Sequence, residues 1–192
     1  MSTPGLEEMR LLRNLAFAGA VSSADEIIGF QGEIPLLLES LVAAGLIEVD
    51  GVIAPTDEGL AVLEQWYAED RDLLTVCSGD ALHEQFRPLD RRVKVLASAW
   101  QDAETRDDWD ARMVVVEGLD VLHADTLGWL DHLARDVPRF VEYRDRLSVA
   151  CEHVLEGETD YVVKVELDSY HTIWFQMHED LLRLLGRERD PE

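Results

Sequence analysis

The stretch LVAAGLIEVDGVIAPTDEGLAVLE, residues 41–64, decides the fold expected for the N-terminal part of this chain. It begins as the end of an apolar helical pattern that stops at Gly45, a residue suited to the left-handed turn after a helix. Two short apolar segments, 46–49 and 52–54, flank an Asp-Gly pair that favours a tight hairpin turn. Thr56 then stands where a helix N-cap is expected. The stretch predicts a helix end, a β-hairpin and a new helix.

Helical patterns also precede this stretch. Between about residues 5 and 18, apolar side chains recur at steps of three and four, at Leu6, Met9, Leu12 (or Leu11) and Leu15. A short helix is expected from Ser22 or Ser23 to residue 28, a turn over 29–32, and a helix over 33–44 that buries Leu37, Leu38, Leu41 and Val42. The order helix, helix, helix, hairpin, helix predicts a winged helix-turn-helix module over residues 1–76.

The segment 41–64 resembles the recognition-helix end and wing of MarR-type and related regulators. The resemblance covers about one third of the chain, and it implies a winged-helix fold that reads DNA. That family offers Arg, Lys, Ser, Thr or Asn to the DNA groove, whereas the corresponding helix here offers Glu33, Pro35, Glu39 and Ser40. The departure argues against DNA binding more than against the fold.

The charge of the chain also argues against DNA binding. Residues 14–70 contain no Lys, Arg or His and eleven acidic residues, and the whole chain has 17 Lys plus Arg against 40 Asp plus Glu, a net charge of -23. Duplex nucleic acid is bound mainly by neutralising its phosphates, so nucleic acid is not the expected partner. The excess is spread over the chain, and the sequence does not decide whether it reflects partner choice or a proteome-wide bias. Glu33 and Glu39 are interpreted as part of a surface for a protein partner.

Length and composition predict a cytoplasmic globular protein. Hydrophobic residues make up 47% of the 192 residues, enough for a core. No apolar run has the length of a membrane span, and MSTPGLEEMR lacks the pattern of a signal peptide, so no membrane association is expected. Cys77 and Cys151 lack the spacing of a zinc site and predict two reduced thiols. No cofactor or metal is predicted.

Four helical patterns without strand alternation predict an antiparallel helical bundle over residues 77–192, after a hinge near 75–79. The expected helices cover 80–101, with a kink or restart at Pro88, then 109–135, 138–157 and 169–185. The predicted fold class is therefore mainly α: a winged helix-turn-helix with a small β-hairpin wing, followed by an antiparallel bundle.

Two surfaces of the bundle are candidate contact sites. Arg87, Arg91 and Lys94 fall at helical steps and form a basic stripe that could receive an anion or an acidic partner; a solvated face balanced by Asp90 and Glu84 is the alternative. The segment DSYHTIWFQMHED, residues 168–180, gathers aromatic and imidazole groups on one helix, and its candidates for a ligand or partner surface are His171, Trp174, Phe175 and His178. Two partly buried histidines hydrogen-bonded inside the bundle are the alternative there.

Metal and catalytic patterns are weak. His171 and His178 are two turns apart, about 10 Å, which is too far for one ion. Asp120 and His123 form one acid-x-x-His step, whereas di-metal bundles use two. The chain has no phosphate-binding glycine loop, nucleophile elbow or metalloprotease motif, so no catalytic residue is assigned, and enzymatic activity is not expected although the sequence leaves it open.

A second resemblance covers nearly the whole chain. The segments FRPLDRRVKVLASAWQ (86–101), VLHAD (121–125) and DSYHTIWFQMHEDLLRLLGRER (168–189), after a degenerate winged helix, look like helical accessory regions of some pyruvate phosphate dikinase-type, phosphoenolpyruvate-utilising enzymes. This implies a separate regulatory or partner subunit of a phosphotransfer system, because the catalytic domains of that family do not fit in 192 residues.

The function expected from the sequence is that of a non-catalytic regulatory or accessory protein that uses the acidic module for protein-protein contact. One alternative is a MarR-like transcriptional regulator that senses a small ligand in the bundle. Another is a metal-binding or enzymatic bundle using His123, His171 and His178 with nearby acids. The identity of the partner or ligand, residual DNA binding and a homodimer are left open.

Overall fold

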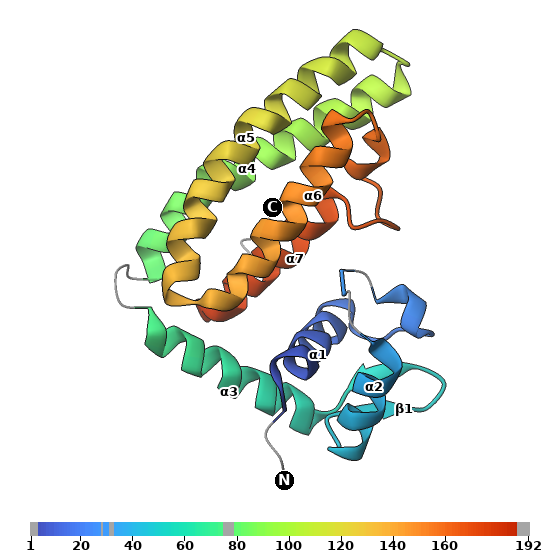
Figure 1. The fold of residues 1–192 in the computed structure, drawn as a ribbon, viewed down its shortest axis with the longest axis vertical. Coiled ribbons are helices and arrows are strands. Elements are labelled where there is room, and N and C mark those ends of the chain that lie inside the picture. The colour runs from blue at the N-terminus through green and yellow to red at the C-terminus, as the bar shows by residue number, and fades with distance from the viewer. Residues whose placement is uncertain (1–3, 28, 31–32, 75–78, 188–192) are drawn as a thin grey trace. The chain divides into compact units, whose positions relative to one another are not determined.

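A computed structural model describes residues 4–27, 29–30, 33–74 and 79–187. In these ranges the fold is mainly α, with seven α-helices and one small antiparallel β-hairpin, which confirms the predicted fold class (Figure 1). The chain forms two compact units, one from residues 1–71 and 179–192 and the other from residues 72–178. The last helix, α7 (Tyr170–Leu184), therefore contributes its first part to unit 2 and its second part to unit 1.

Unit 1 has the predicted order of elements around a hairpin. In order, they are α1 (Leu6–Ala18), the 3-10 turn η1 (Ala24–Glu26), α2 (Ile34–Ala43), β1 (Ile47–Val49), β2 (Ile53–Pro55) and α3 (Asp57–Leu73). Val49 pairs with Ile53, so the hairpin loop has three residues, and Gly51 takes a left-handed φ of 74° within it. Gly45 likewise has a φ of 74°, in the turn after α2 where the sequence predicted it.

The second predicted helix is shorter than expected. Its α-helix over 22–28 is a three-residue 3-10 turn in the structure, and residue 28 lies outside the described residues, as do 31 and 32 of the predicted turn. The reason is local: Val21 donates to and accepts from the backbone of Ile53, at 3.1 and 2.8 Å, as an isolated β-bridge. The extended chain at Val21 leaves too few residues before Gly29 for a full α-helix.

Thr56 confirms the predicted N-cap of α3. Its Oγ1 accepts a hydrogen bond from the backbone N–H of Gly59 at 3.1 Å and donates one to the carbonyl of Gly45 at 2.7 Å. Gly59 is required at this place, because a Cβ there would lie 2.0 Å from the carbonyl oxygen of Leu46. The cap and the close approach hold the start of α3 against the end of the α2 turn.

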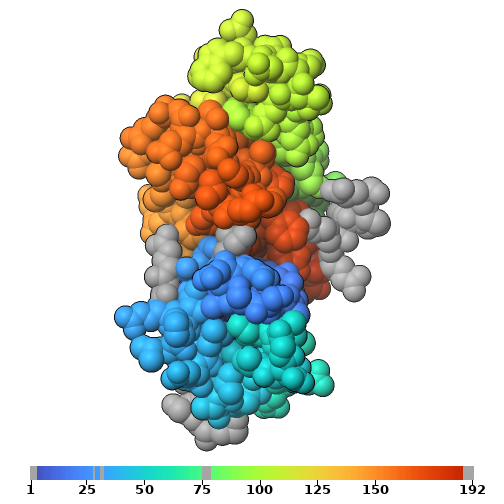
Figure 2. Space-filling view, turned by 90° about the vertical axis from the view of Figure 1, so that its right-hand side faces the viewer, coloured from blue at the N-terminus to red at the C-terminus, as the bar shows by residue number. Residues whose placement is uncertain are grey.

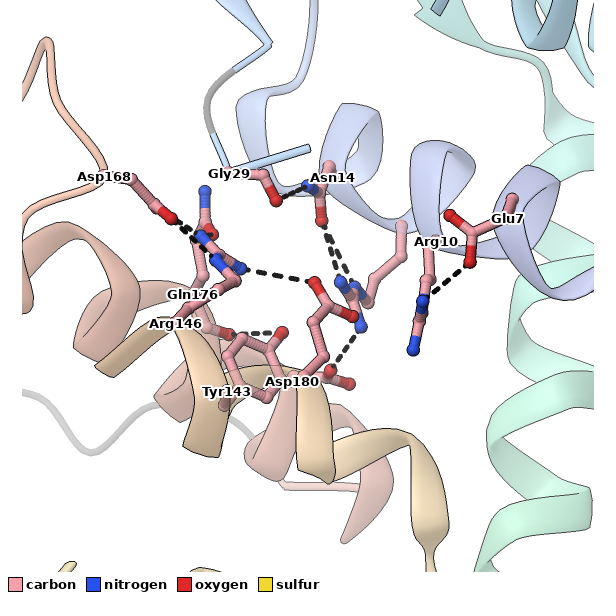
Figure 3. Close-up of polar contacts among 11 residues, drawn as sticks. Glu7, Arg10, Asn14, Gly29, Tyr143, Arg146, Asp168, Gln176 and Asp180 are labelled. Carbon is pink, nitrogen blue, oxygen red and sulfur yellow. Dashed lines mark hydrogen bonds and ion pairs between the residues drawn. The ribbon is translucent and has the colours of Figure 1, made fainter. Parts of the chain in front are cut away.

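A buried ion pair lies inside unit 1. Nη1 of Arg13 on α1 donates to Oδ2 of Asp180 on α7 at 3.1 Å, and both side chains have no solvent-exposed area. Arg13 also donates to Oδ1 of Asn14, and Asn14 in turn donates to the carbonyl of Gly29 at 3.4 Å (Figure 3). The pair ties the end of the chain to its first helix.

The elements of unit 2 are α4 (Gly79–Thr105), α5 (Trp109–Asp136), the turn η2 (Pro138–Phe140), α6 (Val141–Leu155), the turn η3 (Thr159–Tyr161) and the first part of α7. In unit 2, α4 packs against α5 and α5 packs against α6. A three-residue turn connects α4 to α5, which run antiparallel (Figure 1). In the space-filling view the yellow-green end of this helix pair adjoins the orange segment that holds α6 and η3 (Figure 2).

A kink and a restart were the two alternatives expected at Pro88, and the restart is wrong. The helix α4 continues through Pro88. Proline removes one backbone N–H, and the carbonyl of Glu84 consequently has no helical partner. Because Pro88 and Glu84 are both exposed, water can satisfy that carbonyl. The other three helices lie within a few residues of their predicted bounds, and Ser169 caps α7 by accepting from the N–H of Thr172 at 3.2 Å.

The core of unit 2 contains a second buried arginine. Arg146 on α6 donates to both carboxylate oxygens of Asp168, at 3.0 and 2.6 Å, to Glu142 at 3.3 Å and to the side-chain carbonyl of Gln176 at 2.6 Å (Figure 3). Burial alone would lower the pKa of Arg146, but the hydrogen bonds and charges of its acidic partners raise it overall. The guanidinium stays charged in the protein interior.

Three further predictions have different outcomes. The domain boundary between residues 76 and 77 and Cys77 itself lie outside the described residues, so both stay predictions.

Cys151 is a free thiol, and burial raises its pKa to about 11, which makes it unreactive at neutral pH. No helix in the described ranges combines the length and the apolar character needed to cross a membrane.

Candidate functional site

The exposed side of α2 is the most unusual surface of unit 1. Four residues at steps of three, here called the α2 stripe, are all exposed: Glu33, Leu36, Glu39 and Val42. Leu36 is 60% and Val42 45% exposed, and Leu41 is the one buried residue of the helix. The prediction that Val42 is buried is therefore wrong, because α2 meets the rest of its unit along a narrow side while its apolar residues cover more than that side.

The wing adds to this composition. Val49 and Val52 at the end of the hairpin are exposed, and so are Glu48 and Asp50 beside them. Glu8 on α1 accepts a hydrogen bond from Ser40 of α2, which lowers the pKa of Glu8 and keeps a further carboxylate charged next to the helix. Unit 1 thus presents exposed apolar side chains between carboxylates. Glu33, the N-cap of α2, and Glu39 within the helix are both exposed.

Arginines of unit 1 do not supply a positive surface. Arg13 is fully buried against Asp180, so its charge cannot reach a ligand in solvent. Arg10 pairs with Glu7 at 2.7 Å, Arg71 pairs with Glu64 at 2.6 Å, and Arg183 pairs with Glu179 at 3.3 Å. Within the described part of the unit, each of these charges has a carboxylate beside it. A phosphate backbone would meet little uncompensated positive charge here.

The aromatic segment of α7 divides into two faces in unit 2. Trp174 and His178 are buried, whereas His171 and Phe175 are exposed. The phenyl ring of Phe86 on α4 stacks on Trp174 with centroids 5.3 Å apart, and it also contacts His178 at 4.9 Å. The structure therefore brings two of the four candidates together and directs the other two to solvent.

Asp90 joins the two buried candidates. Its Oδ1 accepts from Nε1 of Trp174 at 3.0 Å and lies 3.3 Å from Nδ1 of His178, while Lys94 is 3.5 Å from Oδ2. Burial would raise the pKa of Asp90, but the hydrogen bonds from His178 and Trp174, together with the charges of His178 and Lys94, lower it to about 2. From the sequence, Asp90 is expected only as a surface counter-charge, although its position one turn after Phe86 on the same helix is a signal for this grouping.

The basic stripe lies on the exposed side of α4, as predicted. Arg87 pairs with Glu84 at 3.0 Å and Lys94 pairs with Asp90, whereas Arg91 has no ion-pair partner among the described residues. Arg91 borders an open, mainly apolar groove of about 580 Å³ between α4 and α5, lined by Pro88, Arg91, Arg92, Val95, Leu96, Gly118 and Val121. The groove is large enough for a small ligand.

The three histidines of the metal-binding alternative are not assembled into one group in the described ranges. His123 lies 3.4 Å from the hydroxyl of Tyr170, and burial lowers the pKa of its imidazole. His178 contacts Asp90, and His171 is exposed. These positions give no shared coordination site for the candidates chosen from the sequence.

Comparisons of the chain with protein-family profiles, curated proteins and solved structures find no match. The resemblances to MarR-type regulators and to phosphoenolpyruvate-utilising enzymes therefore stay predictions.

Proposed function

We propose that this chain is a non-catalytic regulatory or accessory protein of the cytoplasm and that the α2 stripe binds a protein partner. The observation that carries the proposal is the exposure of Leu36 and Val42 beside the exposed carboxylates of Glu33 and Glu39. Exposed apolar side chains flanked by charges are typical of protein contact sites, and the acidic flanks exclude a phosphate backbone.

The chemistry of the stripe specifies its partner. The complementary surface would present apolar residues that cover Leu36 and Val42, together with Arg or Lys facing Glu33 and Glu39. The acidic groups would accelerate association at low salt, and the apolar contact would sustain the complex as salt increases. A phosphoenolpyruvate-utilising phosphotransfer enzyme is the first partner class to test, because the sequence resemblance names it.

The proposal is tested with matched variants of two exposed apolar residues. Leu36→Asp changes the stripe, and Val114→Asp, at a residue 67% exposed in unit 2, introduces the same charge elsewhere. Proteins captured from the native cell by the wild-type chain are identified, and the binding of each purified candidate is measured. We expect one protein to bind the wild type and Val114→Asp equally and Leu36→Asp at least about tenfold more weakly.

Charge reversal gives a second readout of the same surface. Glu33→Lys with Glu39→Lys should lower the association rate at low salt and weaken its salt dependence. Retention of the partner by both Leu36→Asp and the charge-reversed variant would overturn the proposal. Selective binding of one duplex DNA sequence at about 150 mM salt would do the same.

A second candidate function is a transcriptional regulator that senses a ligand in the bundle, and the groove beside Arg91 is the observation that favours it. Its positive end and apolar lining would suit an apolar carboxylate. Because Arg10, Arg13, Arg71 and Arg183 of unit 1 are paired with carboxylates, DNA binding by the described residues would require Arg91 and Lys94. If DNA binding is detected and Arg91→Glu with Lys94→Glu leaves it unchanged, this route is excluded.

A further inference from the structure

The C-terminal end of α6 folds back on itself. Gly157 takes a φ of +97°, its N–H donates to the carbonyl of Val154 at 3.1 Å, and the N–H of Glu158 donates to the carbonyl of His153 at 2.9 Å. This pair of hydrogen bonds is a Schellman motif, which ends a helix and reverses the chain. It returns Glu158 to the side of His153, which lies one turn before the end of the helix.

Three side chains converge at this reversal. His153, Glu156 and Glu158 place potential ligand atoms within 4.8 Å of one another, the one such group of three found among the described residues. The imidazole of His153 is held by a stacking contact. The ring of Tyr161 lies on it with centroids 4.1 Å apart and planes 13° from parallel. A stacked ring is held in one orientation, which favours metal binding over a freely rotating side chain.

The imidazole nitrogen faces the carboxylates without a hydrogen bond. Nδ1 of His153 is shielded from solvent and has no hydrogen-bond partner in the described part of the chain. Oε1 of Glu158 lies 3.3 Å from it but outside hydrogen-bond geometry. Two ligands each about 2.1 Å from an ion at a tetrahedral angle are about 3.4 Å apart, so this separation suits two groups that share an ion.

We propose that His153, Glu156 and Glu158 bind a divalent transition-metal ion, with Zn²⁺ as the reference ion. One imidazole and two carboxylates satisfy the charge and ligand preferences of Zn²⁺ and leave the fourth position for water. The nitrogen ligand disfavours Mg²⁺ and Ca²⁺, which prefer oxygen ligands. This site is independent of the α2 stripe, and its success or failure does not bear on the proposed partner surface.

Calorimetric titration of the full-length, tag-free chain with Zn²⁺ tests the site, with excess Mg²⁺ present to occupy diffuse carboxylate sites. We expect one saturable equivalent of Zn²⁺ in the wild type. His153→Gln and Glu158→Gln should each weaken it at least about tenfold, because even outer-shell partners of metal ligands act on that scale. Glu152→Gln removes the same charge at the residue before His153 on α6 and should leave the affinity unchanged. Absence of a saturable equivalent, or equal losses in Glu152→Gln and Glu158→Gln, overturns the proposal.

A spectroscopic measurement keeps the test independent of variant folding. In the ¹⁵N-labelled wild type, Zn²⁺ should shift the Nδ1 resonance of His153 and leave those of His132 and His171 unchanged. A shift of Nε2 alone, or similar shifts of all histidines, contradicts the proposed coordination. Circular dichroism of the variants before titration confirms that they retain the helical fold.

Discussion

Two buried arginines, Arg13 in unit 1 and Arg146 in unit 2, are satisfied differently. Arg13 donates to Asp180 and to the side-chain oxygen of Asn14, and the side chains of Arg13 and Asp180 have no solvent-exposed area. Arg146 shares its donors among Asp168, Glu142 and Gln176, and the side chain of Asp168 is 29% exposed. The pair of Arg13 with Asp180 is therefore dry, whereas Arg146 distributes its charge over several groups, one of them hydrated.

The difference indicates how much stability one carboxylate contributes beside each of the two arginines. Removal of one member of a buried pair leaves an uncompensated charge in a low-dielectric interior. The free energy lost in this way is larger than the net stability that the intact pair contributed. Where other acceptors and water remain, the same removal leaves a charge that is still solvated. One helix supplies both cases, because α7 contributes Gln176 to unit 2 and Asp180 to unit 1.

The largest expected effect is at Asp180. Asp180→Asn keeps the shape of the side chain but removes the negative charge beside the buried Arg13, so we expect unit 1 to lose about 3–5 kcal/mol of stability. Native-state hydrogen exchange read by mass spectrometry measures the loss separately in peptides of each unit. The double variant Arg13→Met with Asp180→Leu removes both charges and should recover most of the loss. A loss below about 1 kcal/mol would show that the pair is hydrated in solution.

The intermediate effect is at Asp168. Asp168→Asn leaves Arg146 with Glu142 and Gln176, so the expected loss is about 1–2 kcal/mol, confined to unit 2. Adding Glu142→Gln removes the second carboxylate and should cost more than the two single losses combined, because the remaining carboxylate compensates in each single variant. Hydrogen exchange in peptides of α6 gives both values. Strict additivity, or a single loss as large as that of Asp180→Asn, would abolish the contrast between the units.

Periodicity and turn residues were sufficient to predict most of this fold. Gly45, Thr56 and Gly157 act as local signals whose geometry hardly depends on the rest of the chain, and the structure confirms each. The failures have a different origin. The exposure of Val42 and the shortening of the second helix depend on which neighbours pack against them, which in the second case is the bridge between Val21 and Ile53.

The candidate sites show the same limit. Trp174 and His178 could be chosen from their segment, but the grouping with Asp90 required the packing of α4 against α7. The sequence predicts an isolated His153, because the relation of His153 to Glu158 depends on a chain reversal at Gly157. The steps from 153 to 156 and 158, with a glycine between the acids, were the available sequence signal.

The last expected effect, no larger than that at Asp168, is an acid-dependent one at Asp90, which has a hydrated side like Asp168 but accepts a hydrogen bond from an indole. Its pKa is about 2 in the folded protein and about 3.9 when unfolded, so its charge stabilises the fold above pH 4 and this stability is lost as the pH falls through 2. We expect the charge of Asp90 to contribute about 1–2 kcal/mol of folding stability at neutral pH, a value reduced for solvent access, and about half of it near pH 3.

Urea unfolding of the wild type and Asp90→Asn at several pH values, followed in unit 2, measures the difference. Asp125→Asn, which removes an exposed partner of Arg92, is the matched control and should cost less than about 1 kcal/mol. If the difference between the wild type and Asp90→Asn stays constant from pH 7 to pH 2, Asp90 is not held as a carboxylate by Trp174 and His178. The contrast would then rest on the two arginine centres alone.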